Sequence, residues 1–176
     1  EPGRLHGRID TENQADAVPV AANVPDNALV SYGDIDDELV DIFLEEADEL
    51  VEGAEKSLQS WKQNIDDVES VNELKRILHT LKGGARMAEL TPIGDLTHAL
   101  ETTIIDAAED NPEPMMPAMQ EALDTIVSML SKVTDRAPIE SAAPTIAILN
   151  QAKDGGAPAA AAPVINDAGD LQAEDI

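Results

Sequence analysis

The sequence lacks cysteine and is poor in aromatic residues, and both shortages narrow what the chain can be. Without cysteine it has no disulfide, no thiolate metal ligand and no cysteine nucleophile. Tyr32, Phe43 and Trp61 are its only aromatic side chains, whereas Ala, Leu, Ile, Glu and Asp are abundant. Sheets favour aromatic and β-branched residues, and helices favour Ala, Leu and Glu, so this composition indicates a helical bundle.

Basic residues are also scarce, with 11 Lys and Arg against 36 Asp and Glu and a formal net charge of -25. Nucleic acids and anionic membranes would repel such a chain, so we expect neither as a partner. No apolar run approaches the roughly 20 residues that span a bilayer, and no signal sequence opens the chain, which favours a cytoplasmic protein. Since the first residue is Glu1 and not Met, we interpret the sequence as an excerpt from a longer chain.

The 176 residues suggest one ordinary domain between two tails. Residues 1–34 are polar and interrupted by prolines, which predicts a flexible leader. Residues 35–135 carry sustained apolar periodicity and form the expected domain. Residues 136–176 form an acidic Ala/Pro-rich linker, with a candidate short helix over 145–153. Both tails are expected to be disordered.

Four amphipathic patterns within the domain predict four helices. The first covers about 36–63, the second about 70–90, the third begins at Thr91 and ends near Asn111, and the fourth follows after Pro112. Ser70 and Thr91 are the expected N-caps of the second and third helices. The apolar positions of the four patterns are Leu39, Ile42, Phe43, Leu50, Ala54, Leu58 and Trp61; Val71, Leu74, Ile77, Leu78, Leu81, Ala85 and Ala88; Ile93, Leu96, Leu100, Ile104 and Ala107; and Met119, Leu123, Ile126, Leu130 and Val133. The short connections predict an all-α, antiparallel, up-and-down four-helix bundle that remains a monomer.

A histidine on the second helix stands out because of its neighbours. At about 100° per residue, one stripe of this helix, here called the His79 stripe, is separate from the apolar face. Its members are Lys75, His79, Lys82, Gly83 and Arg86. The stretch 71–90 also carries more basic than acidic residues, against the trend of the chain. His79 is therefore expected to point outward from a locally basic surface.

The adjacent Gly83 and Gly84 need an explanation, because each costs about 1 kcal/mol in a helix relative to alanine. An imidazole is a nucleophile, a nearby ammonium favours a developing phosphate charge, and a turn without side chains admits another protein. Together these features favour a phosphoryl-accepting site with a docking surface around it. The plain alternatives are an exposed histidine without a task and, for Lys75, Arg76 and Arg86, a solvated helix face.

The third helix offers a partner for His79 in the sequence HALE, where His98 and Glu101 are three residues apart and share a face. A carboxylate that accepts the proton of one imidazole nitrogen fixes the tautomer and frees the other nitrogen to attack. Glu101 is the candidate for that carboxylate. On spacing alone, an ordinary surface glutamate and a histidine packed at the bundle edge remain open.

The stretch LHTLKGGARMAELTPIGDLTHALE, residues 78–101, resembles the histidine phosphotransfer (HPt) domains of CheA-type chemotaxis kinases, in which His-x-x-Lys-Gly-Gly is followed by His-x-x-Glu on the next helix. The resemblance covers about residues 36–134. It implies that His79 is phosphorylated, that Glu101 contacts its other ring nitrogen, and that Lys82 and His98 tune the site. It also implies docking of a kinase or receiver domain beside Gly83 and Gly84, with Lys75 and Arg86 as further docking candidates. The Ala/Pro-rich flanks resemble kinases with several HPt modules in series, such as those that control type IV pili.

The function expected is therefore a phosphorelay, in which His79 takes a phosphoryl group from a kinase domain and passes it to an aspartate of a response regulator. Neither GxxxxGK[ST] nor GxGxxG occurs, so ATP and Mg²⁺ should belong to partners and no cofactor is expected in this chain. The alternative is a helical scaffold in which His79 is dispensable. A metal site made of His79, His98 and Glu101 is disfavoured, because bundle di-iron centres need a Glu-x-x-His motif from each of two helices and additional carboxylates.

Overall fold

The structure is a computed structural model that describes residues 32–155, and every regular element in this range is a helix. In chain order the elements are η1 (Tyr32–Asp34), α1 (Asp37–Gln63), α2 (Val68–Met87), α3 (Thr91–Glu109), η2 (Glu113–Met115), α4 (Met116–Thr134) and α5 (Ala143–Lys153). The predicted all-α fold is confirmed. The expected disorder of the leader and of the last residues lies outside the described residues.

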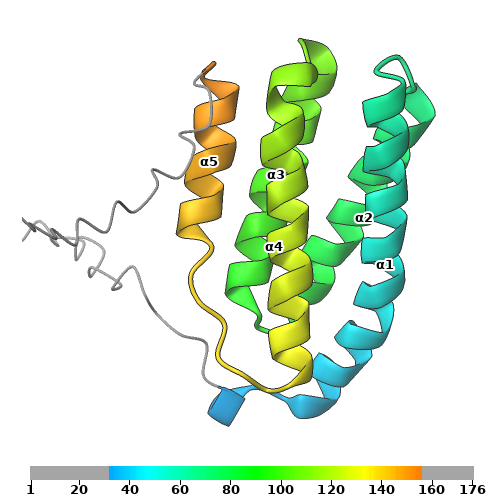
Figure 1. The fold of residues 1–176 in the computed structure, drawn as a ribbon. Helices are drawn as coiled ribbons and strands as arrows, with labels where there is room; N and C mark the ends of the chain where they lie inside the picture. The colour runs from blue at the N-terminus through cyan, green and yellow to red at the C-terminus, as the bar shows by residue number, and fades with distance from the viewer. Residues whose placement is uncertain (1–31, 156–176) are drawn as a thin grey trace, which may run out of the picture.

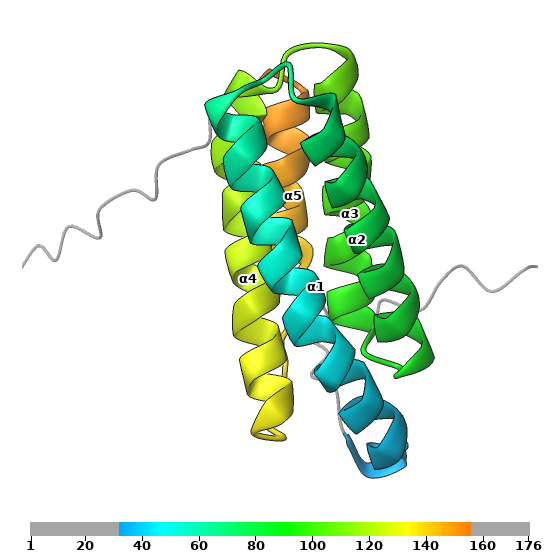
Figure 2. The same ribbon diagram turned by 90° about the vertical axis from the view of Figure 1, so that its right-hand side faces the viewer.

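The first four long helices form the predicted antiparallel bundle. Helix α1 packs on α2, α2 on α3 and α3 on α4, and α4 closes the bundle against α1. Figure 1 shows α3 and α4 at the centre, with α1 and α5 on opposite sides of them. After a quarter turn, α1 lies in front, between α4 and α2 (Figure 2). This order places α2 and α3 side by side.

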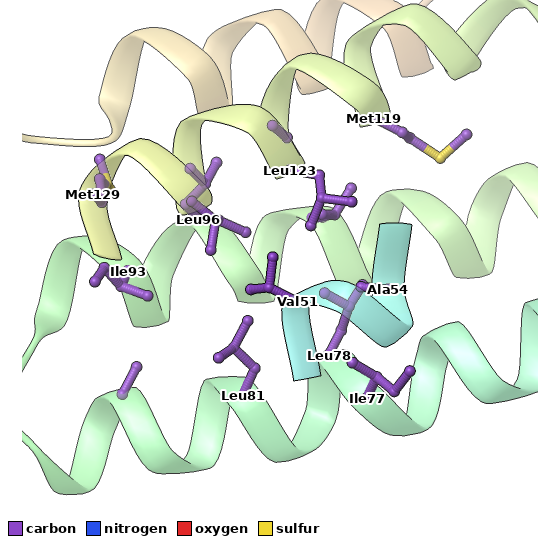
Figure 3. Close-up of a cluster of buried hydrophobic side chains, with 14 of the residues drawn as sticks. Val51, Ala54, Ile77, Leu78, Leu81, Ile93, Leu96, Met119, Leu123 and Met129 are labelled. Carbon is purple, nitrogen blue, oxygen red and sulfur yellow. The ribbon is translucent and has the colours of Figure 1, made fainter. Parts of the chain in front are cut away.

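The core is made by the apolar faces that the periodicity predicts. Leu78 and Leu81 of α2 meet Leu96 of α3 and Leu123 of α4 at the centre of the bundle, as Figure 3 shows, and all four side chains are fully buried. Burial of one such side chain contributes about 1.5–3 kcal/mol. These contacts hold the helices that carry the candidate site at a fixed distance from one another.

Two apolar residues assigned to the core face of α1 are exposed. Leu39 and Ile42 are 40% and 57% exposed, while Phe43 is buried. At 100° per residue Ile42 lies about 100° around the helix from Phe43, whose ring faces Gly84 of α2. The prediction that Leu39 and Ile42 are buried is wrong. Apolar residues at i, i+3 spacing define a stripe of α1 that is wider than the surface covered by the neighbouring helices.

The start of α2 also differs from its prediction. The helix begins at Val68, and its N-cap is Asp67, not Ser70. The Asp67 carboxylate accepts hydrogen bonds from the backbone N–H of Ser70 at 3.1 Å and from the Ser70 hydroxyl at 2.6 Å. Aspartate and serine are both good N-caps. Because Asp67 is the cap and its carboxylate binds Ser70, the helix starts at Val68, before Ser70.

The turn between α2 and α3 is tight. Thr91, the expected N-cap of α3, is its first helical residue, and Leu90 occupies the cap position without a side-chain bond. Helix α2 ends in a Schellman arrangement, in which the N–H of Leu90 donates to the carbonyl of Ala85 at 2.9 Å. Glu89 takes the left-handed backbone position at φ 58°. This tight turn sets α3 antiparallel to α2. Helix α3 ends at Glu109, two residues before the expected Asn111.

The fifth helix, expected over 145–153, runs over Ala143–Lys153 and packs on α3 and α4. Leu149 is fully buried, and the Lys153 ammonium lies 2.6 Å from Asp106 of α3. The part of the sequence assigned to the linker thus includes a helix that belongs to the packed core. None of the helices between residues 32 and 155 has the length and apolarity needed to cross a bilayer.

Candidate functional site

His79 projects into solvent from the middle of α2. Its side chain is 73% exposed, whereas the leucines at positions 78 and 81, on the opposite face, are fully buried. The outward orientation that the helical period predicted is therefore confirmed. The buried face anchors the backbone of this turn, so the imidazole stands on a rigid support.

Glu101 of α3 faces His79 across the groove between the two helices. The Nδ1 atom of His79 lies 3.1 Å from Oε1 of Glu101, and the Glu101 side chain is only 12% exposed. An ionised carboxylate can only accept, so Nδ1 carries the proton in this contact. Nε2 is then the nitrogen with the free lone pair. The contact predicted from HALE is present in the structure.

Lys82 completes the site from one turn further along α2. Its ammonium donates to the second oxygen of Glu101, Oε2, at 2.5 Å, and its side chain is 14% exposed. The sequence suggested a lysine aimed at incoming phosphate, whereas in this structure the ammonium is bound to the carboxylate. Both carboxylate oxygens are thus engaged, which fixes the orientation of Glu101 toward His79.

The pKa of Glu101 reflects these contacts. Partial burial by itself would raise the pKa, because it disfavours the charged form. The hydrogen bonds from Lys82 and His79, together with their positive charges, outweigh this effect and lower the pKa below the ordinary glutamate value. Glu101 is therefore held as a carboxylate, the form that can accept the Nδ1 proton.

His98 is not brought onto the His79–Glu101 pair by any hydrogen bond in the described structure. Its exposed side chain lines a groove of about 350 Å³ between α3 and α5, together with Asp95, Asn150 and Lys153. It lies on α3 one turn before Glu101, toward α5. A tuning role for His98 stays a prediction.

The two glycines have different surroundings. A Cβ added at Gly83 would meet nothing within 4 Å, so this turn presents open backbone next to His79. A Cβ added at Gly84 would lie 2.9 Å from Cδ2 of Phe43, closer than side chains pack. Gly84 is thus explained by the close approach of α1 to α2, and the docking role expected of it stays a prediction. Sequence reasoning missed Phe43 as its partner, because nothing local indicates which residue of another helix faces a glycine.

The basic members of the stripe surround this open turn. Arg86 is exposed, and its Cγ would lie 3.2 Å from a Cβ at Gly94, so its stem runs over the start of α3. Lys75 is half-buried beside a cleft at the far end of the α2–α3 groove. Arg76 instead forms an ion pair with Glu73 at 2.6 Å. Lys75 and Arg86 therefore flank His79 on both sides along the helix, and their role in docking stays a prediction.

In the part of the chain that the structure describes, no group of three His, Asp or Glu side chains is arranged to hold an ion. The site consists of one exposed imidazole, one partly buried carboxylate and one lysine that binds it. Such a set can orient and stabilise a nucleophilic imidazole.

Comparison with known proteins points the same way. The chain is 29% identical to the chemotaxis protein CheA of Borreliella burgdorferi over 99 residues, which cover 54% of this chain and 11% of that protein. It is 37% identical to CheA of Treponema pallidum over 65 residues, 37% of this chain and 8% of that protein. The chain thus spans only about a tenth of the length of these relatives.

A solved structure shares the fold: the phosphorylated P1 domain of CheA3 from R. sphaeroides, in complex with CheY6, aligns with a TM-score of 0.55 at 24% identity. The alignment covers 68% of this chain and 96% of that one. Residues 38–133, the four-helix bundle that carries His79, Lys82 and Glu101, match the Hpt domain family. The chain therefore belongs to the family of Hpt domains, related to the P1 domains of CheA proteins.

Proposed function

We propose that His79 is the residue on which this Hpt domain carries the phosphoryl group, and that the group is bound at Nε2. The observation that carries the proposal is the contact between Nδ1 and the partly buried Glu101 carboxylate at 3.1 Å. It commits the proton to Nδ1 and leaves the Nε2 lone pair directed to solvent, where a donor can approach.

In the forward step the Nε2 lone pair forms a bond to the γ-phosphorus of ATP held by a kinase domain. The bond from that phosphorus to the bridging oxygen breaks, and ADP leaves. The imidazole becomes positively charged, and the Glu101 carboxylate stabilises this charge through Nδ1–H. Lys82 holds the carboxylate in place throughout, because its ammonium occupies the other oxygen.

In the onward step a carboxylate oxygen of a receiver aspartate attacks the same phosphorus. The P–N bond breaks, its electron pair returns to Nε2, and the imidazole is neutral again with its proton still on Nδ1. Mg²⁺ and ATP belong to the partner domains, in keeping with the absence of nucleotide-binding motifs from this sequence.

The surface around His79 supports docking of these partners. In-line transfer needs the donor or acceptor group within about 3–3.5 Å of the attacking atom, so a partner backbone must come close. Gly83 leaves that approach open, and Lys75 and Arg86 supply positive charge on either side. Beyond the domain itself, we propose a cytoplasmic multi-module kinase as its context, with residues 35–135 as the Hpt unit. The kinases that control type IV pili are an example with linkers of similar style.

Incubation with a CheA-type kinase core, ATP and magnesium, followed by intact mass measurement, tests the proposal. We expect one added phosphoryl group that is stable to alkali and lost in acid, as a phosphoramidate is. His79→Gln should abolish it, and His98→Gln, a matched change on α3, should leave a phosphorylatable site. Label that persists in His79→Gln would exclude His79, and would favour the scaffold alternative if it also proved unspecific.

A further inference from the structure

An exposed apolar side chain lies in line with the His79 stripe, at the start of the same helix and far from the histidine. Val68, the first residue of α2, is 67% exposed. It precedes His79 by eleven residues, which is three helical turns and about 16 Å along the axis, and the two side chains therefore point in nearly the same direction. A partner that covers His79 and extends toward the start of α2 would meet Val68.

Val68 borders a cleft of about 360 Å³, here called the end cleft, between the start of α2 and the end of α3. Trp61, Val71 and Pro112 are buried and form its apolar floor, and the exposed Ile65 is at its rim. The indole N–H of Trp61 is already used, since it donates to the carbonyl of Ile65 at 3.2 Å. The floor therefore offers no unpaired donor, and an apolar group suits it best.

The rim of the end cleft is acidic. Asp66, Glu109 and Asp110 line it, and within residues 32–155 none of the three forms an ion pair. Lys75 lines the side of the end cleft nearer to His79 and belongs to the His79 stripe. Along this one face, positive charge around His79 is thus followed by an apolar cleft and then by negative charge.

We propose that the end cleft anchors the receiver domain that exchanges phosphoryl groups with His79, by accepting an apolar side chain that stands next to a Lys or Arg. The proposal rests on the proposed function and adds a second contact to it. A receiver carries its phosphoryl acceptor as a carboxylate of its own, so one rigid body can present negative charge to the His79 stripe and positive charge to the acidic rim. A kinase presents the phosphates of its nucleotide at His79. Its own surface therefore needs no negative patch beside a positive one. Charge complementarity of this kind raises the rate of encounter and fixes the orientation of docking.

Transfer from purified phospho-His79 protein to a receiver domain tests the anchor. The probe is whichever receiver of the source organism removes the phosphoryl group fastest in a screen. Val68→Lys removes the apolar contact and repels the Lys or Arg that the receiver places beside it. The receiver concentration at half-maximal rate should therefore rise about tenfold, as expected when most of the burial of a valine is lost. The rate at saturating receiver should stay within about twofold, because the chemistry at His79 is unchanged. Glu109→Lys should also raise the half-maximal concentration, and added salt should weaken binding of the unaltered protein.

Matched controls come from the groove between α1 and α4, which has the same residue types on another face. Val127 is 38% exposed there and Asp48 lines the same groove, so Val127→Lys and Asp48→Lys should leave receiver transfer unchanged. Melting curves of all four variants show whether folding is preserved. Labelling by phosphoramidate, which needs no docking surface, should be equal in all of them.

The outcomes separate the two proposals. Equal half-maximal concentrations for Val68→Lys and Val127→Lys would overturn the anchor, and so would a loss confined to kinase-driven labelling, which would assign the cleft to the kinase. If the unaltered protein is not labelled at His79, or no receiver removes the label, the proposed function itself fails.

Discussion

Exchanging each of the two adjacent glycines of α2 for alanine should change stability in opposite directions. Gly83→Ala removes the helix penalty of glycine, about 1 kcal/mol, and adds a methyl group where nothing lies within 4 Å. Gly84→Ala removes the same penalty but places Cβ 2.9 Å from Cδ2 and 3.3 Å from Cε2 of Phe43. Because that ring is buried, it cannot swing aside freely, and overpacking of this kind costs about 1–3 kcal/mol.

The net expectation is a gain of up to about 1 kcal/mol at Gly83 and a loss of up to about 2 kcal/mol at Gly84. For a fold of this size, 1 kcal/mol corresponds to a shift in Tm of about 3–5 °C. Thermal unfolding followed by far-UV circular dichroism should therefore separate the variants by several degrees. Equal stability of Gly83→Ala and Gly84→Ala would refute the packing account of Gly84.

A double-mutant cycle identifies the contact responsible. Phe43→Leu removes the ring atoms nearest to position 84, so Gly84→Ala should be much less damaging in that background than alone. If the cost of Gly84→Ala is the same with and without the ring, the strain lies elsewhere.

The functional half of this prediction uses a larger side chain at the open position. Gly83→Met should keep or raise the melting temperature, yet it places a flexible chain beside His79, across the path of an approaching protein. Kinase-driven labelling should fall, whereas labelling by phosphoramidate should stay near that of the unaltered protein. Full-rate transfer from the kinase would show that the open turn serves another purpose, and a large loss of stability would show that Gly83 is packed.

Three further perturbations address Glu101 and the turn that positions it. Glu101→Gln should slow phosphorylation of His79 by on the order of 10²-fold in a kinase-core assay with little change in helical content, and an unchanged rate would make the carboxylate irrelevant. Since the pKa of Glu101 is lowered in the folded state, its contribution to stability should be complete above the ordinary glutamate pKa and should disappear as the pH falls through the lowered value. Urea unfolding of the unaltered protein and of Glu101→Gln over that pH range should converge at the acid end, and parallel curves would contradict the shift. Glu89→Gly should stabilise the fold by about 0.5–1 kcal/mol in the same assay, because Glu89 has a left-handed φ of 58°, and a loss of stability would mean that the side chain has a contact of its own.

Much of the candidate site followed from the helical period and from the motif. His79 points outward because the leucines of its helix occupy the other side, and side-chain direction along a helix depends only on spacing. The bundle class followed from composition and from four apolar patterns joined by short connections. The pairing of His79 with Glu101 rested on the order of the two motifs, together with an antiparallel turn between them.

Other features depended on which helix faces which. By local spacing, Leu39, Ile42 and Phe43 were all predicted to face the core. Only the position of α2 decided that Phe43 is buried against Gly84 and that the other two remain exposed. The start of α2 was set by competition between two good caps, Asp67 and Ser70.

The sequence alone determined the helical class, the four amphipathic segments and the outward direction of His79, because each of these depends on composition and on residues within a few turns of one another. Tertiary structure decided that Lys82 binds Glu101, that Gly84 makes room for Phe43, and that α5 packs on α3 and α4. The physical reason is the same in all three cases. Each contact joins residues of different helices, and its existence depends on interhelical distances that the packing of the whole core sets.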